Sequence, residues 1–185
     1  MHSSESEIFE CDRTIIADTL QVSPDEVGMD SVLEKDFGAG SIDLVDIMSR
    51  IESELHVQFC DTGALDTLEE LFGSDVLSEQ GALTELGAEV MRERMPEASQ
   101  GEIVAGLPVP EVPRLYTTRT WVRAALELLE ARPRVCQKCA GEKLRLARIS
   151  VVACEGCDEE IACPTQQDLL ADWARKFQRG PDARR

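Results

Sequence analysis

The sequence has few aromatic residues and no long hydrophobic run. Phe, Trp and Tyr together make up 4% of the 185 residues, so any core must be built mainly from aliphatic side chains. No apolar stretch approaches the about 20 residues that a membrane-spanning helix needs. The first residues are polar and acidic, unlike the apolar centre of a secretory signal. We therefore expect a cytoplasmic protein without a membrane span.

Several motifs of catalytic and nucleotide-binding sites are also missing. The chain contains no glycine-rich phosphate-binding loop and no serine-hydrolase elbow. Of its two histidines, His2 lies in the polar first residues and His56 at the end of the helix predicted after Ser41, so neither is expected to act as a base or a metal ligand. These absences favour a protein that is not an enzyme.

Negative charge is concentrated in the first half of the chain. Residues 1–94 contain 23 Asp and Glu against 5 Lys and Arg, whereas residues 95–185 contain 13 against 14. An acidic surface repels phosphate backbones, so nucleic acid is not expected as a partner. The same charge attracts basic protein surfaces, although it also keeps a small domain soluble. The contrast between the halves predicts two physically different modules.

A serine stands at the start of an acidic amphipathic pattern. Ser41 follows a Gly-Ala-Gly run, which is expected to hold its hydroxyl in solvent. Serine is also a preferred N-cap residue, so a purely structural role is the alternative. The pattern predicts a helix with one apolar face, made of Ile42, Val45, Met48, Ile51 and Leu55. Four carboxylates lie mostly off this face: Asp43, Asp46, Glu52 and Glu54.

The stretch from about Ile8 to Cys60 resembles the acyl carrier protein family. In that family an Asp-Ser-Leu tripeptide opens the second helix, and its serine carries a 4'-phosphopantetheine arm through a phosphodiester. This chain has Gly40-Ser41-Ile42 at that place. The resemblance implies that Ser41 is the attachment site and that the chain is in this sense a phosphoprotein. Other positions match at the family's spacing: Leu20, Val22, Val27, Leu33, Asp36, Gly38, Ala39, Asp43, Val45, Glu52 and Glu54.

The resemblance also implies a function and a set of partners. The chain would hold acyl intermediates as thioesters on the arm, for fatty acid biosynthesis, polyketide synthesis or related lipid metabolism, without catalysing a step itself. Its partners would be a phosphopantetheinyl transferase and acyl-transferring or condensing enzymes with basic docking surfaces. These surfaces would contact Asp43, Asp46, Glu52 and Glu54. The alternative is an unmodified adaptor or regulatory protein that keeps the acidic carrier fold only for protein contacts.

Apolar patterns and breakers divide the chain into three predicted ranges. Residues 6–94 are predicted to form one acyl-carrier-like helical bundle. Residues 95–115, which contain several Pro and Gly, are predicted to form a linker that packs partly through Ile103, Val104 and Leu107. Residues 116–179 are predicted to form a helix, a small cysteine-rich module and a second helix. The fold class is therefore mainly α. The helices expected in the bundle cover about 6–20, 41–55, 65–72 and 83–95.

Two Cys-x-x-Cys pairs, separated by fourteen residues, lie in the second half of the chain. Each pair can turn two thiolates toward one ion, and the alternating residues between them predict a hairpin that brings the pairs together. The pattern resembles a zinc ribbon with four ligands: Cys136, Cys139, Cys154 and Cys157.

Such a closed four-sulfur site has no open coordination position, so its role is structural. A redox dithiol and a rubredoxin-like iron site are the alternatives, and the nearby Cys163 stays unassigned. Lysines and arginines in this half of the chain predict a mildly basic surface for protein contacts.

Overall fold

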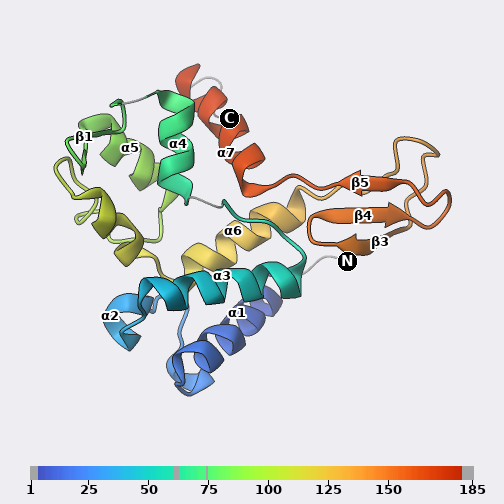
Figure 1. The fold of residues 1–185 in the computed structure, drawn as a ribbon, viewed down its shortest axis with the longest axis horizontal. Helices are drawn as coiled ribbons and strands as arrows, with labels where there is room; N and C mark the ends of the chain where they lie inside the picture. Colours follow the sequence, from blue (N-terminus) through green and yellow to red (C-terminus); the bar gives the residue numbers. More distant parts are fainter. Residues whose placement is uncertain (1–3, 61–62, 74, 181–185) are drawn as a thin grey trace.

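The computed structural model describes residues 4–60, 63–73 and 75–180, so His2 lies outside the described residues. The chain is mainly helical, as predicted (Figure 1). The α-helices are α1 (Glu5–Leu20), α2 (Leu33–Phe37), α3 (Ser41–Leu55), α4 (Ala64–Phe72), α5 (Glu85–Arg94), α6 (Thr118–Glu130) and α7 (Gln166–Gln178). Two 3-10 helices are η1 (Pro24–Glu26) and η2 (Val109–Leu115).

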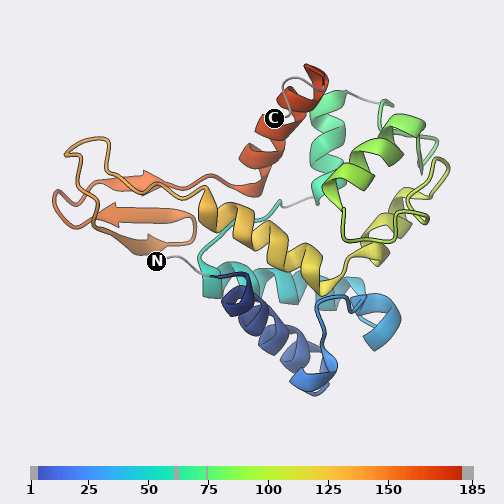
Figure 2. The same ribbon diagram turned by 180° about the vertical axis from the view of Figure 1, so that it is seen from behind.

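The strands form two small antiparallel sheets. β1 (Ser78–Glu79) pairs with β2 (Ala82–Leu83) in a short hairpin. β3 (Leu144–Arg148), β4 (Val151–Cys154) and β5 (Glu160–Ala162) form a second sheet in that order. This second sheet projects from one end of the helical part of the chain (Figures 1 and 2). It contains the hairpin predicted between the two cysteine pairs.

Local sequence explains where the long helices begin. Ser4 and Glu7 form a reciprocal capping box at the start of α1. A second capping box starts α7, where the Thr165 N–H donates to Asp168 Oδ2 at 2.8 Å and the Asp168 N–H donates back to Thr165 Oγ1. Each cap satisfies amide groups that a helix leaves without partners, at a gain of about 1 kcal/mol.

The first hydrophobic core lies between α1, α3 and α6. α1 packs against both other helices, and Figures 1 and 2 show α6 between the α1–α3 pair and the group formed by α4, α5 and α7. The core is closed by aliphatic side chains, consistent with the low aromatic content. Fully buried members of this core include Ile16, Ile47, Ile51, Val122 and Leu128.

The second hydrophobic core lies between α4, α5, η2 and α7. α7 returns from the cysteine-rich sheet and packs along α4. The range predicted as a linker contributes to this core, because Ile103 is fully buried and Val112 is 1% exposed. Close packing also fixes Gly87 of α5, since a Cβ there would lie 1.8 Å from the carbonyl oxygen of Leu77.

The two cores do not follow the predicted ranges 6–94, 95–115 and 116–179. α6 belongs with α1 and α3, while α4 and α5 belong with α7. The physical reason is that an amphipathic pattern identifies which face of a helix is buried but not which helix covers it. α4 and α5 lie apart from α1. The apolar side of the α1–α3 pair is therefore covered by α6, which begins about sixty residues after α3 ends.

The apolar face predicted for α3 is only partly correct. Ile51 is fully buried, but Ile42 is 83% exposed and Val45 is 59% exposed. A second stripe with the same three-to-four spacing faces the core instead. It begins at Leu44 and shares Met48, Ile51 and Leu55 with the predicted face. The inward residues are Leu44, Ile47, Met48, Ile51 and Leu55.

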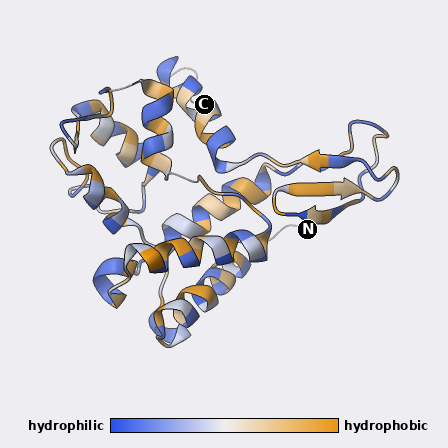
Figure 3. Ribbon diagram, viewed as in Figure 1, coloured by the Kyte–Doolittle hydropathy of each residue, from blue (hydrophilic) through white to orange (hydrophobic). Residues whose placement is uncertain are grey.

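The buried central strand of the second sheet, β4, is apolar. In Figure 3 the ribbon of β4 is orange over most of its length, and all four of its residues are buried. Neighbouring β3 is largely exposed and forms an edge of the sheet.

Among the residues that the structure describes, no helix combines the length and the apolar composition that a bilayer span requires.

Candidate functional site: an exposed serine and a four-cysteine cluster

Ser41 is exposed and occupies the first position of α3. The N-cap is Gly40, so the alternative in which Ser41 is only an N-cap residue is wrong. Buried Ala39 fixes the chain just before it, and Gly38 ends α2 in the left-handed region with a φ of 71°. Two adjacent helix ends therefore hold the serine hydroxyl at a fixed point on the surface.

The start of α3 favours negative charge beside Ser41. The backbone N–H groups of a first helical turn point outward and carry the positive end of the helix dipole. The Gly40 N–H is satisfied by Asp43, whose Oδ2 accepts it at 2.8 Å. A phosphodiester on the Ser41 oxygen would lie near the remaining first-turn amides, which are good hydrogen-bond donors for phosphate oxygens.

The four carboxylates predicted to meet partners have different surroundings. Asp43 is half-buried in the cap of α3, and the exposed Asp46 accepts a hydrogen bond from Thr19 Oγ1 at 3.2 Å. Glu52 Oε1 accepts the Phe59 backbone N–H at 2.7 Å, while Glu54 is exposed. Two of the four, Asp46 and Glu54, therefore offer exposed negative charge on α3.

Two exposed apolar residues beside Ser41 were not predicted from the sequence. Ile42 and Val45 were assigned to the core, but they lie on the surface one residue and one turn after the serine. Single exposed apolar residues are common on proteins, whereas a pair next to a candidate site is informative. Together with the exposed carboxylates, they give α3 a mixed apolar and acidic outer face.

The four predicted cysteine ligands are brought together. Their sulfur atoms all lie within 4.8 Å of one another. The Sγ atoms of Cys136 and Cys157 are 3.7 Å apart, and those of Cys139 and Cys154 are 3.5 Å apart. Four sulfurs at tetrahedral corners, each about 2.3 Å from one ion, would lie about 3.8 Å apart. The donor set and its spacing therefore fit a tetrahedral metal ion.

Both cysteine pairs adopt the same turn. In the first, the Cys136 N–H donates to Gly141 O and the Ala140 N–H donates back to Cys136 O, both at 2.8 Å. In the second, Cys154 makes the corresponding two bonds, at 2.9 Å each, with Glu159 O and the Asp158 N–H. The backbone amides inside such a turn point at the sulfur atoms.

The surroundings of the cluster leave little space and shift the pKa values of its thiols in opposite directions, because hydrogen bonds among the thiols and burial raise the pKa values of Cys139 and Cys157 while that of Cys136 is lowered. The backbone N–H of Cys139 lowers the pKa of the Cys136 thiol to about 7, which favours the deprotonated form that binds metals. A Cβ on Gly141 would lie 3.2 Å from Cys139 Sγ and 3.4 Å from Cys154 Sγ, so the glycine is packed against the sulfurs. Cys163 is buried outside the cluster.

The surface of the cysteine-rich sheet is less basic than predicted. Each cation on it that forms an ion pair does so with a carboxylate of the same module, as Lys138 does with Glu159 at 2.7 Å and Arg148 with Glu160 at 2.9 Å. Arg145 lies 3.5 Å from a third carboxylate, that of Asp158. These ion pairs within the module neutralise positive charge that the sequence analysis assigned to contacts with a partner.

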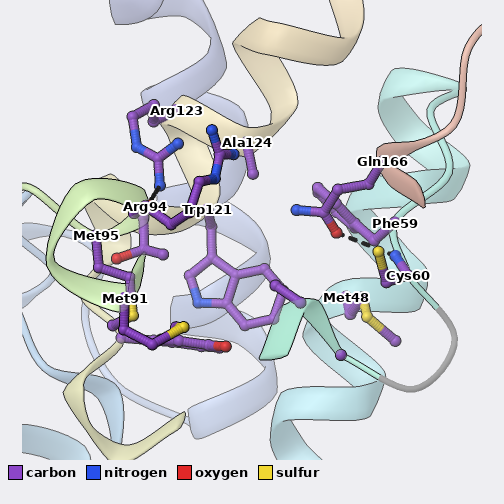
Figure 4. A pocket seen from close by; sticks show the side chains of 14 residues that line it. Met48, Phe59, Cys60, Met91, Arg94, Met95, Trp121, Arg123, Ala124 and Gln166 are labelled. Atoms are coloured by element: carbon purple, nitrogen blue, oxygen red, sulfur yellow. Dashed lines mark hydrogen bonds between the residues drawn. The ribbon is translucent and has the colours of Figure 1, made fainter. Parts of the chain in front are cut away.

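A small cavity lies between the two hydrophobic cores. Its volume is about 90 Å³, and its walls are mainly apolar. Figure 4 shows the Trp121 ring at its centre, with Met91 of α5 and Met95, the residue after α5, to one side and Met48 of α3 to the other. Phe59 packs edge-on against Trp121, with ring centroids 5.9 Å apart. The cavity is therefore built jointly by α3, α5 and α6.

A mainly helical core with an exposed serine at the start of an acidic helix is the arrangement of a carrier protein. Residues 13–78 match the family model described as "Phosphopantetheine attachment site". This range includes Ser41 and ends within β1, so α5, α6 and the cysteine cluster lie outside it. No solved structure gives a significant match to the chain.

Curated relatives point to the same class. An acyl carrier protein of Clostridium perfringens is 39% identical over 57 residues, which cover 31% of this chain and 75% of the relative. One of Campylobacter hominis is 34% identical over 58 residues, covering 31% and 73%, and one of Petrotoga mobilis is 43% identical over 54 residues, covering 29% and 64%. The chain belongs to the acyl carrier protein family.

Proposed function

We propose that this protein carries acyl groups as thioesters on a 4'-phosphopantetheine arm attached to Ser41. The observation that carries the proposal is the exposed serine at the first position of α3, inside the range that matches the phosphopantetheine attachment family. The arm supplies the thiol that forms the thioester. The chain's own residues hold the attachment point, offer amides to the phosphodiester and present α3 to enzymes, so its role is that of a carrier and not of a catalyst.

The outer face of α3 supports a set of partners. We propose that a phosphopantetheinyl transferase and acyl-transferring or condensing enzymes dock basic surfaces on the exposed Asp46 and Glu54. The half-buried Asp43 and Glu52 add negative charge to the same helix. The exposed Ile42 and Val45 add an apolar contact next to the modified serine. The same class of partner would place the chain in fatty-acid, polyketide or related acyl metabolism in the cytoplasm.

We further propose that the four clustered cysteines hold one structural zinc ion. Tetrahedral zinc prefers four thiolates at the sulfur spacing found here, and the two identical turns supply two ligands each. Because all four ligands come from the protein, the ion has no position left for a substrate.

Mass spectrometry tests the carrier proposal. The full-length protein is incubated with coenzyme A and a phosphopantetheinyl transferase, and the intact mass is measured. We expect a gain of one arm for the wild type and for Ser49→Ala, a control at another exposed serine of α3, but no gain for Ser41→Ala. An unchanged wild-type mass with a competent transferase would leave the unmodified adaptor as the better explanation.

Gly40→Asp tests the one departure from the family's tripeptide. Gly40 has a φ of −90°, and a Cβ there would meet only Asp43 Oδ2, at 3.5 Å, so an aspartate fits without backbone strain. If the residue before the serine contacts the transferase, Gly40→Asp should gain the arm faster than the wild type at equal enzyme concentration. Equal rates would mean that Gly40 does not limit modification.

A further inference from the structure

The end of α3 is held by groups from the cysteine-rich part of the chain. The His56 carbonyl oxygen accepts hydrogen bonds from Arg132 Nη2 at 3.0 Å and from the Ser150 N–H at 3.1 Å. Arg132 Nη2 also donates to the Leu55 carbonyl oxygen. The last carbonyls of a helix have no partners within it, so these donors complete the C-terminal end of α3.

The residues after His56 are held from the other side by the start of α7. The Gln166 N–H donates to Gln58 O at 2.9 Å, and the Cys60 N–H donates to Gln166 Oε1 at 3.0 Å (Figure 4). Residues 56–60 are here called the junction segment. They are hydrogen-bonded to Arg132, which precedes the cysteine-rich sheet in the sequence, to Ser150 within it and to Gln166, which follows it.

The junction segment connects the two hydrophobic cores. Val57 and Phe59 are buried in the first core, and Cys60 is buried in the second. Phe59, Cys60 and Gln166 also line the cavity between the cores. The position of the junction segment therefore sets both the distance between the cores and the shape of that cavity.

The two ends of β4 carry different contacts. β4 runs from Val151 to Cys154, so one end holds a cysteine of the cluster and the other end follows Ser150 directly. Ser150 lies in the turn between β3 and β4 with a φ of 51°, and its carbonyl oxygen accepts the Cys163 N–H at 2.8 Å. A folded sheet is therefore needed to place the Ser150 amide against His56.

The sheet has little else to stabilise it. Its three strands have five, four and three residues, and only β4 is buried throughout. Small modules with so little buried apolar area commonly depend on metal binding, whose free energy then becomes folding free energy. Losing the ion should unfold the sheet and remove the Ser150 contact to the junction segment.

We propose that the four-cysteine module is a metal-dependent clamp on the junction segment. With the ion bound, Ser150 and Arg132 hold the end of α3, and the junction segment keeps Phe59 and Cys60 in the wall of the cavity. Without it, the segment and the cavity loosen, while Ser41 at the opposite end of α3 stays accessible. Metal availability thereby regulates one end of the carrier helix. The proposal rests on the metal assignment made above but not on the arm at Ser41.

Amide hydrogen exchange of the full-length protein tests the clamp. The zinc-loaded wild type is compared with Cys139→Ser, which removes one ligand. We expect the amides of Val57, Phe59 and Cys60 to exchange at least tenfold faster in the variant, with those of Ile16 in α1 unchanged. Equal exchange of the junction amides in zinc-loaded wild type and metal-free variant would overturn the proposal.

A second pair of variants separates the clamp from general unfolding. Arg132→Gln removes the donor to His56 without changing a cysteine, and Arg134→Gln makes the same charge change at an exposed residue two positions away. We expect faster junction exchange only in Arg132→Gln, with zinc content unchanged in both. The same exchange rates in both variants would contradict the clamp.

Metal content and arm attachment are measured on the same samples. A wild type that takes up no zinc would overturn the metal assignment and the clamp together. Bound zinc with unaltered junction exchange in Cys139→Ser would overturn the clamp alone. The mass gain at Ser41 tests the carrier proposal independently of both, and its persistence in Cys139→Ser would show that the first core remains folded.

Discussion

Asp12 should make the protein less stable as the pH rises. This residue of α1 is fully buried, and neither of its carboxylate oxygens has a hydrogen-bond partner within the described chain. Burial raises its pKa from 3.8 to about 7, because the charged form loses its hydration without gaining a partner. The folded protein therefore binds this proton more tightly than the unfolded chain does.

The magnitude follows from the change in pKa. A difference of about 3 units, at 1.36 kcal/mol each, is about 4 kcal/mol. This stability is fully present below the unfolded pKa near 4 and is lost as the pH rises through about 7. It is a large share of the 5–15 kcal/mol by which domains are typically stable. The isoelectric point of about 4.5 makes acidic measurements prone to precipitation.

Urea denaturation between about pH 5.5 and pH 8.5 is the appropriate assay. Over that range the contribution of Asp12 should fall by about 2 kcal/mol. Asp12→Leu, of similar size, should remove this loss and be more stable than the wild type at the higher pH. Asp12→Asn should also remove the pH dependence, but it keeps a buried polar group. If the wild type and Asp12→Leu lose stability equally over this range, then Asp12 is ionised in the folded protein and the reasoning fails.

Two further predictions concern the two cores and are measured by urea denaturation. Leu128→Ala should lower the free energy of unfolding by about 2–5 kcal/mol, because α6 closes the first core. Leu146→Ala, on the exposed edge strand, should lower it by less than about 0.5 kcal/mol. Equal losses would contradict the placement of α6. Gly87→Ala should lower the free energy of unfolding by about 1–3 kcal/mol or more, because its Cβ clashes with the Leu77 carbonyl. Gly101→Ala, where a Cβ has open space, should leave the free energy of unfolding unchanged. Full stability of Gly87→Ala would contradict the packing of α5.

Local chemistry made the cysteine cluster and the position of Ser41 predictable from the sequence. Two cysteines three positions apart can share one ion only through a tight turn, and two such turns are needed for four thiolates. The spacing alone therefore identified Cys136, Cys139, Cys154 and Cys157. The flexible run and the amphipathic pattern around Ser41 predicted its position at the start of a helix, whereas its proposed role as an attachment site came from the resemblance to the acyl carrier protein family.

Long-range packing was not predictable in the same way. The pairing of α1 with α6 joins residues more than one hundred positions apart, and nothing in either amphipathic pattern identifies the partner. α3 has two apolar stripes with the same spacing, and only the position of its neighbours decides that Ile47 is buried and Ile42 exposed. Ile103 lies in a range predicted to be a linker that packs partly through Ile103, Val104 and Leu107. Ile103 is buried in the second core, but Val104 is 47% exposed, because local Pro and Gly do not show which side chains meet another helix.

Mapping the arm in protein purified from its native host tests the central claim most directly. The purified protein is digested, and the peptide that contains Ser41 is analysed by fragmentation mass spectrometry. We predict that this peptide carries 4'-phosphopantetheine on the Ser41 oxygen, either with a free thiol or with an acyl thioester. A native protein in which Ser41 is consistently unmodified would contradict a carrier function.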